Sequence, residues 1–235
     1  MNTCKEISQE LKSLADAQKA QDLSRFFKTG KGQYGEGDKF LGIVVPKQRE
    51  VARKYKNLKL DDIQIILESQ YHEFRLTALL ILVEKFQKGT TEERKEIFRF
   101  YMKNLRYINN WDLVDVITPK IVGAYLLDKP LQRKILYTLA KSQDLWERRI
   151  AIIATQAFIR SGDFVDTLKI SKILLGDKHD LIHKATGWML REVGKKDLKA
   201  EEEFLDEHHR KMPRTMLRYS IEKFKDDKKR KYMGK

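Results

Sequence analysis

Cysteine is almost absent from the 235-residue chain, and Cys4 is the only one. A single thiol cannot form an internal disulfide bond, so a reducing compartment suits the chain best. A lone cysteine close to a chain terminus is usually an inert side chain. No cysteine or serine with an obvious neighbouring base stands out, so the sequence does not predict a covalent nucleophile.

Long apolar runs are missing too. No segment approaches the ~18–20 consecutive apolar residues that a membrane-spanning helix requires. The polar start, residues 1–5, does not resemble a signal peptide. These absences predict a soluble, cytoplasmic protein without a membrane partner.

Proline and glycine are scarce, at 4 and 12 residues, while apolar residues recur at helical spacing nearly throughout. Thr90 with Glu93, and Asp144 with Glu147, each have the spacing of a capping box. The strand-like run 43–45 is too short to found a sheet. Three prolines are expected in the first turn of a helix: Pro46, Pro119 and Pro130. The sequence therefore predicts an all-helical protein.

The helices also repeat along the chain. Segment 73–79 is similar to segment 147–153, and Arg149, Lys184 and Arg218 fall at matching positions of successive repeats. A period of roughly 35–37 residues with two helices per period is typical of HEAT-like repeats. The predicted fold is an all-α, right-handed α-solenoid of HEAT-like two-helix repeats over residues 1–225, with the aligned basic residues on a concave face. The alternative is that these are unrelated surface lysines and arginines.

Basic residues clearly outnumber acidic ones, 48 against 34, for a formal net charge of +14. Such an excess points first to nucleic acid, then to an anionic membrane or an acidic protein. Residues 210–235 hold 11 Lys or Arg and 3 Asp or Glu, a local net charge of +8. The last ten residues, 226–235, are expected to form a flexible basic tail.

Two motifs suggest a cofactor site or a metal site, but neither has the sequence context that such a site requires. The run 30–37 matches G-x-G-x-x-G, but the strand and βαβ context of a dinucleotide site are missing. A loop is expected there, in which Lys28 and Lys31 are candidates for phosphate contacts. His179 and His183 have i, i+4 spacing, but the glutamate of a zinc protease is absent and no third ligand is evident. Neither a metal nor a cofactor is expected.

The most informative run is Asn109–Asp115, which predicts a short helix begun by an asparagine cap. Trp111 and Asp115 are four residues apart, so they lie on one helical face about one turn apart. In a strongly basic chain, this pair indicates a site that handles a positively charged group while it holds a negatively charged one. Asp112 lies about 100° around the helix and is expected to serve the helix N-terminus.

A second tryptophan has a similar setting. Trp188 lies one turn after Lys184, at the border of the predicted basic face, whereas Trp146 is expected in the core. Arg149 falls just inside the helix that begins near Asp144, and we expect it to act with the Trp111–Asp115 pair.

The sequence resembles the AlkD family of alkylpurine DNA glycosylases over nearly its whole length. The resemblance is carried by residues 26–28, 40–49, 111–115, 146–149 and 184–192. It implies Asp115, Trp111 and Trp188 as catalytic residues. The residues expected to bind DNA are Arg149, Lys184, Arg218, Arg148, Lys28 and Lys31. The glycine loop at 30–38 is longer than in some members, so contacts from that region transfer least well.

The resemblance also implies a reaction, the removal of N3- or N7-alkylated purines from duplex DNA by a monomer without base flipping. Alkylation gives the base a positive charge and makes it a good leaving group, so no strong general acid, metal or cofactor is needed. Asp115 would stabilise the oxocarbenium ion that forms on the sugar. Arg149 would hold a backbone phosphate or fix Asp115, and the sequence does not separate these roles.

Two non-enzymatic hypotheses remain open. The chain could be a solenoid that binds DNA or RNA without chemistry, or a scaffold whose concave face captures an acidic protein. A scaffold explains the charge but not the Trp111–Asp115 pair. An RNA binder usually shows a series of aromatic residues that stack successive bases, and no such series is visible.

Overall fold

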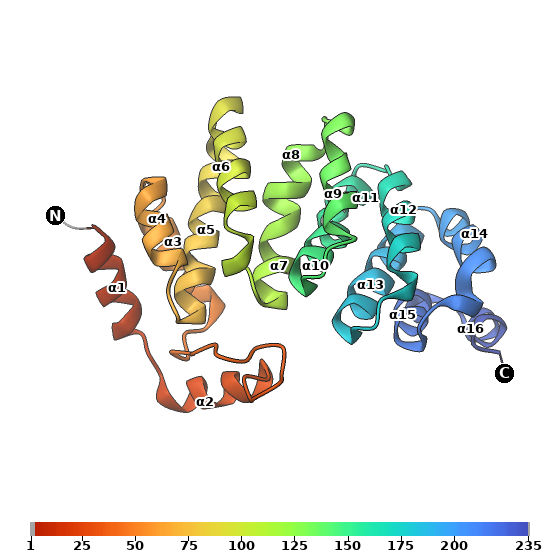
Figure 1. Ribbon diagram of the computed structural model, residues 1–235, viewed down its shortest axis with the longest axis horizontal. Coiled ribbons are helices and arrows are strands. Elements are labelled where there is room, and N and C mark those ends of the chain that lie inside the picture. Colours follow the sequence, from red (N-terminus) through yellow and green to blue (C-terminus); the bar gives the residue numbers. More distant parts are fainter. Residues whose placement is uncertain (1–2, 235) are drawn as a thin grey trace. The chain divides into compact units, whose positions relative to one another are not determined.

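The computed structural model describes residues 3–234 (Figure 1). Its regular elements are helices: no strand occurs among the described residues, and an isolated parallel bridge joins Lys39 to Tyr71. The prediction of an all-helical protein is confirmed. By its contacts the chain divides into two compact units, residues 1–113 and 114–235, and helix α7 (Trp111–Thr118) spans the division. Within the described range, no helix is long and apolar enough to cross a membrane.

The first unit is built around a central buried helix, α5. Its elements are α1 (Thr3–Ser13), α2 (Ala17–Phe26), α3 (Val45–Lys54), α4 (Leu60–Leu67), α5 (His72–Lys88), α6 (Thr91–Lys103) and a 3-10 turn at Leu105–Tyr107. Helix α5 packs against α3, α4 and α6, and α1 packs against α3 and α4. Residues 72–83 are all buried, because a helix that is apolar on nearly every side can be stable only inside the protein.

The second unit is built around α13. Its elements are a π-helical segment (Pro119–Gly123), α8 (Ala124–Leu126), a 3-10 turn (Pro130–Arg133), α9 (Lys134–Leu139), α10 (Leu145–Ala154), α11 (Gln156–Arg160), α12 (Val165–Ile173), a 3-10 turn (Leu174–Gly176), α13 (Asp180–Lys196), α14 (Leu198–His208), a 3-10 turn (His209–Lys211), α15 (Arg214–Ser220), a 3-10 turn (Ile221–Lys223) and α16 (Asp226–Met233). Helix α13 packs against α10, α12, α14 and α15.

Glycine allows a close helix approach in this unit. A Cβ on Gly187 of α13 would stand 2.3 Å from the carbonyl oxygen of Met216 and 2.6 Å from the Cβ of Tyr219, both on α15. No real side chain fits at such distances. The sequence of α13 therefore sets how tightly α15 packs on it.

The helix starts follow local chemistry largely as predicted. Thr90 and Glu93 form the full capping box, with Glu93 N–H donating to Thr90 Oγ1 at 3.3 Å and Thr90 N–H donating to Glu93 Oε2 at 2.7 Å. Asp144 caps α10 by accepting from the backbone N–H groups of Trp146 and Glu147. Pro46 lies in the first turn of α3, and Pro130 begins a 3-10 turn.

Pro119 differs from its expected place. It opens a π-helical segment that continues α7 directly into α8, so it lies inside an unbroken helical run from residue 111 to 126. A proline inside a helix has no N–H to donate and its ring crowds the preceding turn. Widening to a π-helical turn accommodates both effects.

The predicted repeats fall on matching helices. The similar segments lie within α5, α10 and α13, and Arg218 lies in the last turn of α15. In the second unit α10 packs against α13, and α13 against α15, so helices one period apart are neighbours there. The right-handed solenoid with a concave basic face, and the single domain over 1–225, stay predictions.

The expected flexible tail is wrong for residues 226–233, which form α16. Tyr232 is buried, and its hydroxyl donates to Asp206 at 3.0 Å. Lys231 pairs with the same carboxylate at 2.8 Å. The prediction was based on the run of charged residues and did not take account of Tyr232. It also overlooked Asp226 and Asp227, whose negative charges in the first turn favour a helix.

Candidate functional site

Helix α7 begins as the sequence predicts, with an asparagine cap. The side-chain oxygen of Asn110 accepts from the backbone N–H of Trp111 at 2.8 Å. Its amide nitrogen donates to Asp38 at 3.2 Å. Asn110 is fully buried, so the start of α7 is fixed to the end of the glycine loop as well as capped.

Trp111 belongs to an aromatic cluster of the first unit. Its ring stacks on Phe27, with centroids 5.2 Å apart and planes at 21°, and meets the edge of Phe26 at 5.9 Å. Phe27 stacks in turn on Phe40 at 5.0 Å, and Phe40 on His72 at 4.7 Å. Aromatic pairs of this kind are worth ~0.5–1.5 kcal/mol beyond the area that they bury. Trp111 is half-buried, so the cluster holds its ring in place.

His72 lies at the centre of a buried charge network that sequence reasoning missed. Its Nε2 lies 2.8 Å from Asp112 and its Nδ1 3.4 Å from Asp38, and Arg75 donates to Asp38 at 2.7 Å. Burial alone would lower the pKa of His72, but the hydrogen bonds to Asp112 and Asp38 outweigh it and raise the pKa to about 8. A signal was present in the sequence: His72, Glu73 and Arg75 open an otherwise apolar helix, and charges there can be buried only if they are paired.

Asp112 therefore does more than was expected. It does serve the helix N-terminus, since its Oδ1 accepts from the backbone N–H of Leu113 at 2.9 Å. Its other oxygen, however, binds His72, and the residue is only 8% exposed. The expected role at the helix N-terminus is therefore only part of what Asp112 does, because helix periodicity turns this face of α7 toward α5.

Asp115 lies one turn further along α7, in the second unit, and forms a bidentate pair with Arg149 of α10. Arg149 Nε donates to Oδ1 at 2.9 Å and Nη2 to Oδ2 at 2.7 Å. The remaining Nη1 donates to the carbonyl oxygen of Leu181. The side chain of Asp115 keeps 14% of its surface exposed and that of Arg149 only 6%. Such a pair holds a carboxylate in one orientation while leaving one edge open.

Trp188 lies on α13, half-buried, with its indole N–H donating to Glu192 at 3.1 Å. On the same helix Lys184 pairs with Asp180 at 2.6 Å, and its side chain is 40% exposed. Both residues are accessible at the surface of the second unit, as the sequence comparison expected.

The predicted DNA-binding residues separate into two groups. Lys28, Lys31 and Arg218 are exposed. Arg148, in contrast, donates to Asp177 at 2.6 Å and to the carbonyl oxygens of Ser142 and Gln143 at 3.0 and 2.9 Å, so its guanidinium braces two loops. Arg149 is committed to Asp115. Neighbouring arginines on a helix point about 100° apart, and the sequence does not reveal which carboxylate each one meets.

The histidines that raised the question of a metal have structural contacts. His179 caps α13 by accepting from the backbone N–H of Leu181 at 3.2 Å, and His183 bonds the carbonyl oxygen of Asp177 at 2.5 Å. Among residues 3–234, no group of three or more His, Cys, Asp or Glu is arranged to hold a metal ion. Cys4 is buried, and burial raises the pKa of its thiol to about 11, which fits the inert role expected of it.

An apolar cavity of about 430 Å³ lies within the first unit, between α2, α3 and α5. Its walls include Phe26, Phe27 and Phe40, and six of its lining residues are polar or charged: Lys19, Asp22, Gln48, His72, Glu73 and Asp112. Trp111 does not line it. Nothing in the sequence predicted this cavity, although its volume falls in the range of small-molecule sites, ~300–1,000 Å³.

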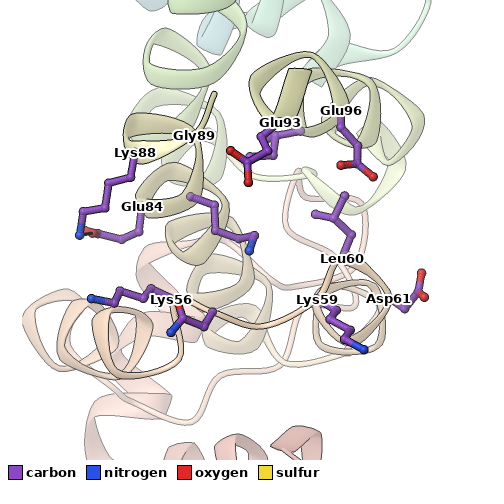
Figure 2. A pocket seen from close by; sticks show the side chains of 12 residues that line it. Lys56, Lys59, Leu60, Asp61, Glu84, Lys88, Gly89, Glu93 and Glu96 are labelled. Atoms are coloured by element: carbon purple, nitrogen blue, oxygen red, sulfur yellow. Dashed lines mark ion pairs between the residues drawn. The ribbon is translucent and has the colours of Figure 1, made fainter. Parts of the chain in front are cut away.

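A wider hollow of about 630 Å³ lies among the α3–α4 connection, the end of α5 and the start of α6 (Figure 2). Four lysines and four carboxylates line it. Glu84 pairs with Lys88 at 3.6 Å, and Glu93 is occupied by its capping box. With the two signs balanced, this hollow does not form a concentrated anion site, so α7 and its partners remain the candidate functional site.

Comparisons with known proteins indicate the family to which the fold belongs. A family model described as DNA alkylation repair enzyme matches residues 7–224. A solved structure described as "Predicted DNA alkylation repair enzyme from Enterococcus faecalis" is similar to this chain with a TM-score of 0.69 and 18% sequence identity, covering 90% of this chain and 97% of that one. At that identity the likeness shows a shared fold. No curated protein matches the chain.

Proposed function

The chain belongs to the family of DNA alkylation repair enzymes, and from that premise we propose that it is a DNA glycosylase. Its substrate would be duplex DNA that carries positively charged N3- or N7-alkylated purines, and the bond cleaved would be the N-glycosidic bond. The observation that supports this most is the bidentate Asp115–Arg149 pair, at 2.9 and 2.7 Å, one helical turn after the stacked Trp111.

The reaction needs a stabilising negative charge more than it needs an acid. An alkylated purine leaves with the electron pair of the C1′–N bond and becomes neutral, while positive charge develops on the sugar. Asp115 would stabilise that charge and orient the water whose oxygen bonds to C1′, and the proton that this water loses would pass to the solvent. Trp111 and Trp188 would each present a π face to the cationic sugar or base, worth ~0.5–2 kcal/mol.

Arg149 acts in this proposal through Asp115 instead of through a phosphate. Each of its three nitrogens donates one hydrogen bond within the protein. An arginine that holds a carboxylate at both oxygens fixes its rotation, which is the property an electrostatic stabiliser needs. Phosphate contacts would then come from Lys184, Arg218, Lys28 and Lys31, and not from Arg148, whose guanidinium is held by Asp177.

We further propose that the duplex lies against a basic face and that the damaged base is not flipped into a pocket. No set of Asn, Gln or Ser side chains stands out in the sequence as a base reader, and among the described residues Trp111 is not part of the lining of the apolar cavity. Discrimination would come from the charge and lability of the lesion. The enzyme would work in base excision repair in the cytoplasm as a monomer, without a metal or a cofactor.

The direct test is base release from a methylated duplex. Purified protein is incubated with duplex DNA that carries N7-methylguanine or N3-methyladenine, and abasic sites are revealed by alkali. We expect strand breaks at the methylated purines and none in unmethylated duplex. Tight duplex binding without abasic sites would instead favour the non-catalytic nucleic-acid-binding scaffold.

A further inference from the structure

Three segments of the first unit converge on one buried histidine. Asp38 comes from the end of the glycine loop, His72 from the start of α5, and Asp112 from the start of α7. His72 touches both carboxylates and is 2% exposed. It is therefore the common contact between the loop, α5 and α7.

We propose that His72 is the positioning residue of Trp111: by bridging Asp38 and Asp112 it fixes the first turn of α7 and thereby the plane in which the indole lies on Phe27. The inference rests on the proposed function only for its consequence for base excision. The placement itself is a property of the fold.

Two routes connect His72 to the indole. The first is covalent, since Asp112 is the next residue after Trp111. The second is packing, because the His72 ring stacks on Phe40, Phe40 on Phe27, and Phe27 on Trp111, with centroid distances of 4.7, 5.0 and 5.2 Å. A shift of the imidazole would therefore move Trp111 both through the backbone at Asp112 and through the stacked rings.

The bridge requires a protonated ring. Imidazolium has two N–H donors and can serve both carboxylates, whereas neutral imidazole has one donor and presents a lone pair to the other carboxylate. Asp38 keeps Arg75 at 2.7 Å and Asn110 at 3.2 Å in either state. The carboxylate of Asp112 forms its ion pair with the protonated ring of His72.

The charged groups around the ring favour the protonated state. Asp112 faces it from α7 and Asp38 from the loop, while Arg75 of α5 opposes protonation less strongly. Glu73 of α5 is turned away, since its carboxylate accepts the backbone N–H groups of residues 41–43 at 2.8 to 3.2 Å. The two carboxylates outweigh burial, and the pKa of His72 is raised to about 8.

The test follows the indole directly, without relying on catalysis. The full-length protein is labelled with ¹⁵N-tryptophan, and the indole N–H resonance of Trp111 is assigned through Trp111→Phe. Between pH 6.5 and 9, this resonance and the His72 ring resonance should titrate with one midpoint near the pKa of about 8. The indole resonance of Trp146 should not follow that midpoint.

A substitution supplies the second arm. In His72→Gln the Trp111 resonance should move from its wild-type position and stop titrating. His209→Gln, a histidine of the second unit, is the matched control and should leave it unchanged. Glu201→Gln removes the other side chain whose pKa is raised to about 8, that of a buried glutamate in α14, and it too should leave the Trp111 titration intact.

The outcomes separate the two ideas. If the Trp111 resonance ignores both the titration of His72 and the His72→Gln change, the positioning role is overturned, and the wild-type titration decides this even if the variant does not fold. Base excision is measured on the same samples. The rate of base excision at pH 7 should be at least about tenfold lower in His72→Gln than in the wild-type protein. The variant should also lack the fall in rate that the wild-type protein shows at alkaline pH. A coupled resonance in a protein that excises no base upholds positioning and contradicts the proposed function instead.

Discussion

At the scale of single residues, the pairing of Asp115 with Arg149 changes what each residue is expected to do. A guanidinium that meets a carboxylate at 2.9 and 2.7 Å through two of its nitrogens has fewer N–H groups left to offer to a phosphate. We therefore propose that the guanidinium of Arg149 serves mainly to orient Asp115, and that most of the DNA affinity comes from other residues.

This distinction can be tested with Arg149→Lys. Lysine keeps the positive charge but lacks the planar fork that fixes both carboxylate oxygens. Because a misplaced catalytic group can cost about 10²-fold in rate, we expect single-turnover excision to fall by about that factor. Affinity for undamaged duplex should change less than twofold. A large loss of affinity with normal excision would restore Arg149 to a phosphate.

The salt dependence of duplex binding tests the exposed basic residues. Lys184→Ala and Arg218→Ala should each make the slope of log affinity against log salt concentration shallower by about 0.9, the value for one phosphate contact. Arg148→Ala is the contrasting variant, since its guanidinium already binds Asp177 at 2.6 Å, and its slope should match wild type. Fluorescence anisotropy between about 50 and 200 mM salt covers the range in which such contacts are resolved. Equal slopes for all four proteins would contradict this division of roles.

At the scale of helices, α13 carries both Lys184 and Trp188, and its packing on α15 depends on Gly187. Gly187→Ala puts a methyl group against the backbone of Met216, where overpacking costs about 1–3 kcal/mol. For a protein of this size that corresponds to a drop of roughly 2–4 °C in Tm for each kcal/mol. Gly176→Ala is the control, because a Cβ there meets nothing within 4 Å. Thermal unfolding that leaves both variants at the wild-type Tm would refute the close approach of the two helices.

What could be predicted at this scale was local. The cap at Asn110, the box at Thr90 and the one-turn spacing of Trp111 and Asp115 each depend on residues within about four positions. The partners of the site do not: Arg149 is 34 positions from Asp115, and His72 is 40 positions from Asp112. Helix periodicity states which residues share a face, but not which other helix covers it, so Arg148 and Arg149 could not be told apart.

The predictions that Pro119 lies in the first turn of a helix and that residues 226–233 form a flexible tail failed for the same reason, because they used local sequence alone. A proline usually marks a boundary, yet here the chain passes it by a local π-helical turn. A run of like charges is usually solvated, yet the single aromatic residue Tyr232 anchors α16 to Asp206. In both cases a tertiary contact or a backbone adjustment overrode the residue statistics.

For the whole molecule, the proposed mechanism predicts which damaged bases the enzyme releases from duplex DNA. A panel of duplexes is scored for base release under single-turnover conditions, with small cationic, bulky cationic and neutral lesions. Cationic bases of both sizes should be released, because no closed cavity has to admit them. Uracil and hypoxanthine should not be released, since their bonds need protonation by a general acid. Rejection of bulky cationic bases would be consistent with a glycosylase but would contradict the absence of base flipping. It would indicate the 430 Å³ cavity as a base pocket.

The central claim is that the carboxylate of Asp115 performs the chemistry, and Asp115→Asn tests it most directly. The amide is nearly isosteric but uncharged, so single-turnover excision of N7-methylguanine should fall at least about 10²-fold, a typical loss for one electrostatic stabiliser. Duplex affinity should stay equal or increase slightly. Asp197→Asn is the matched control, because asparagine caps a helix such as α14 as well as aspartate does, and it should excise at the wild-type rate. Excision by Asp115→Asn within a few-fold of wild type would contradict the account.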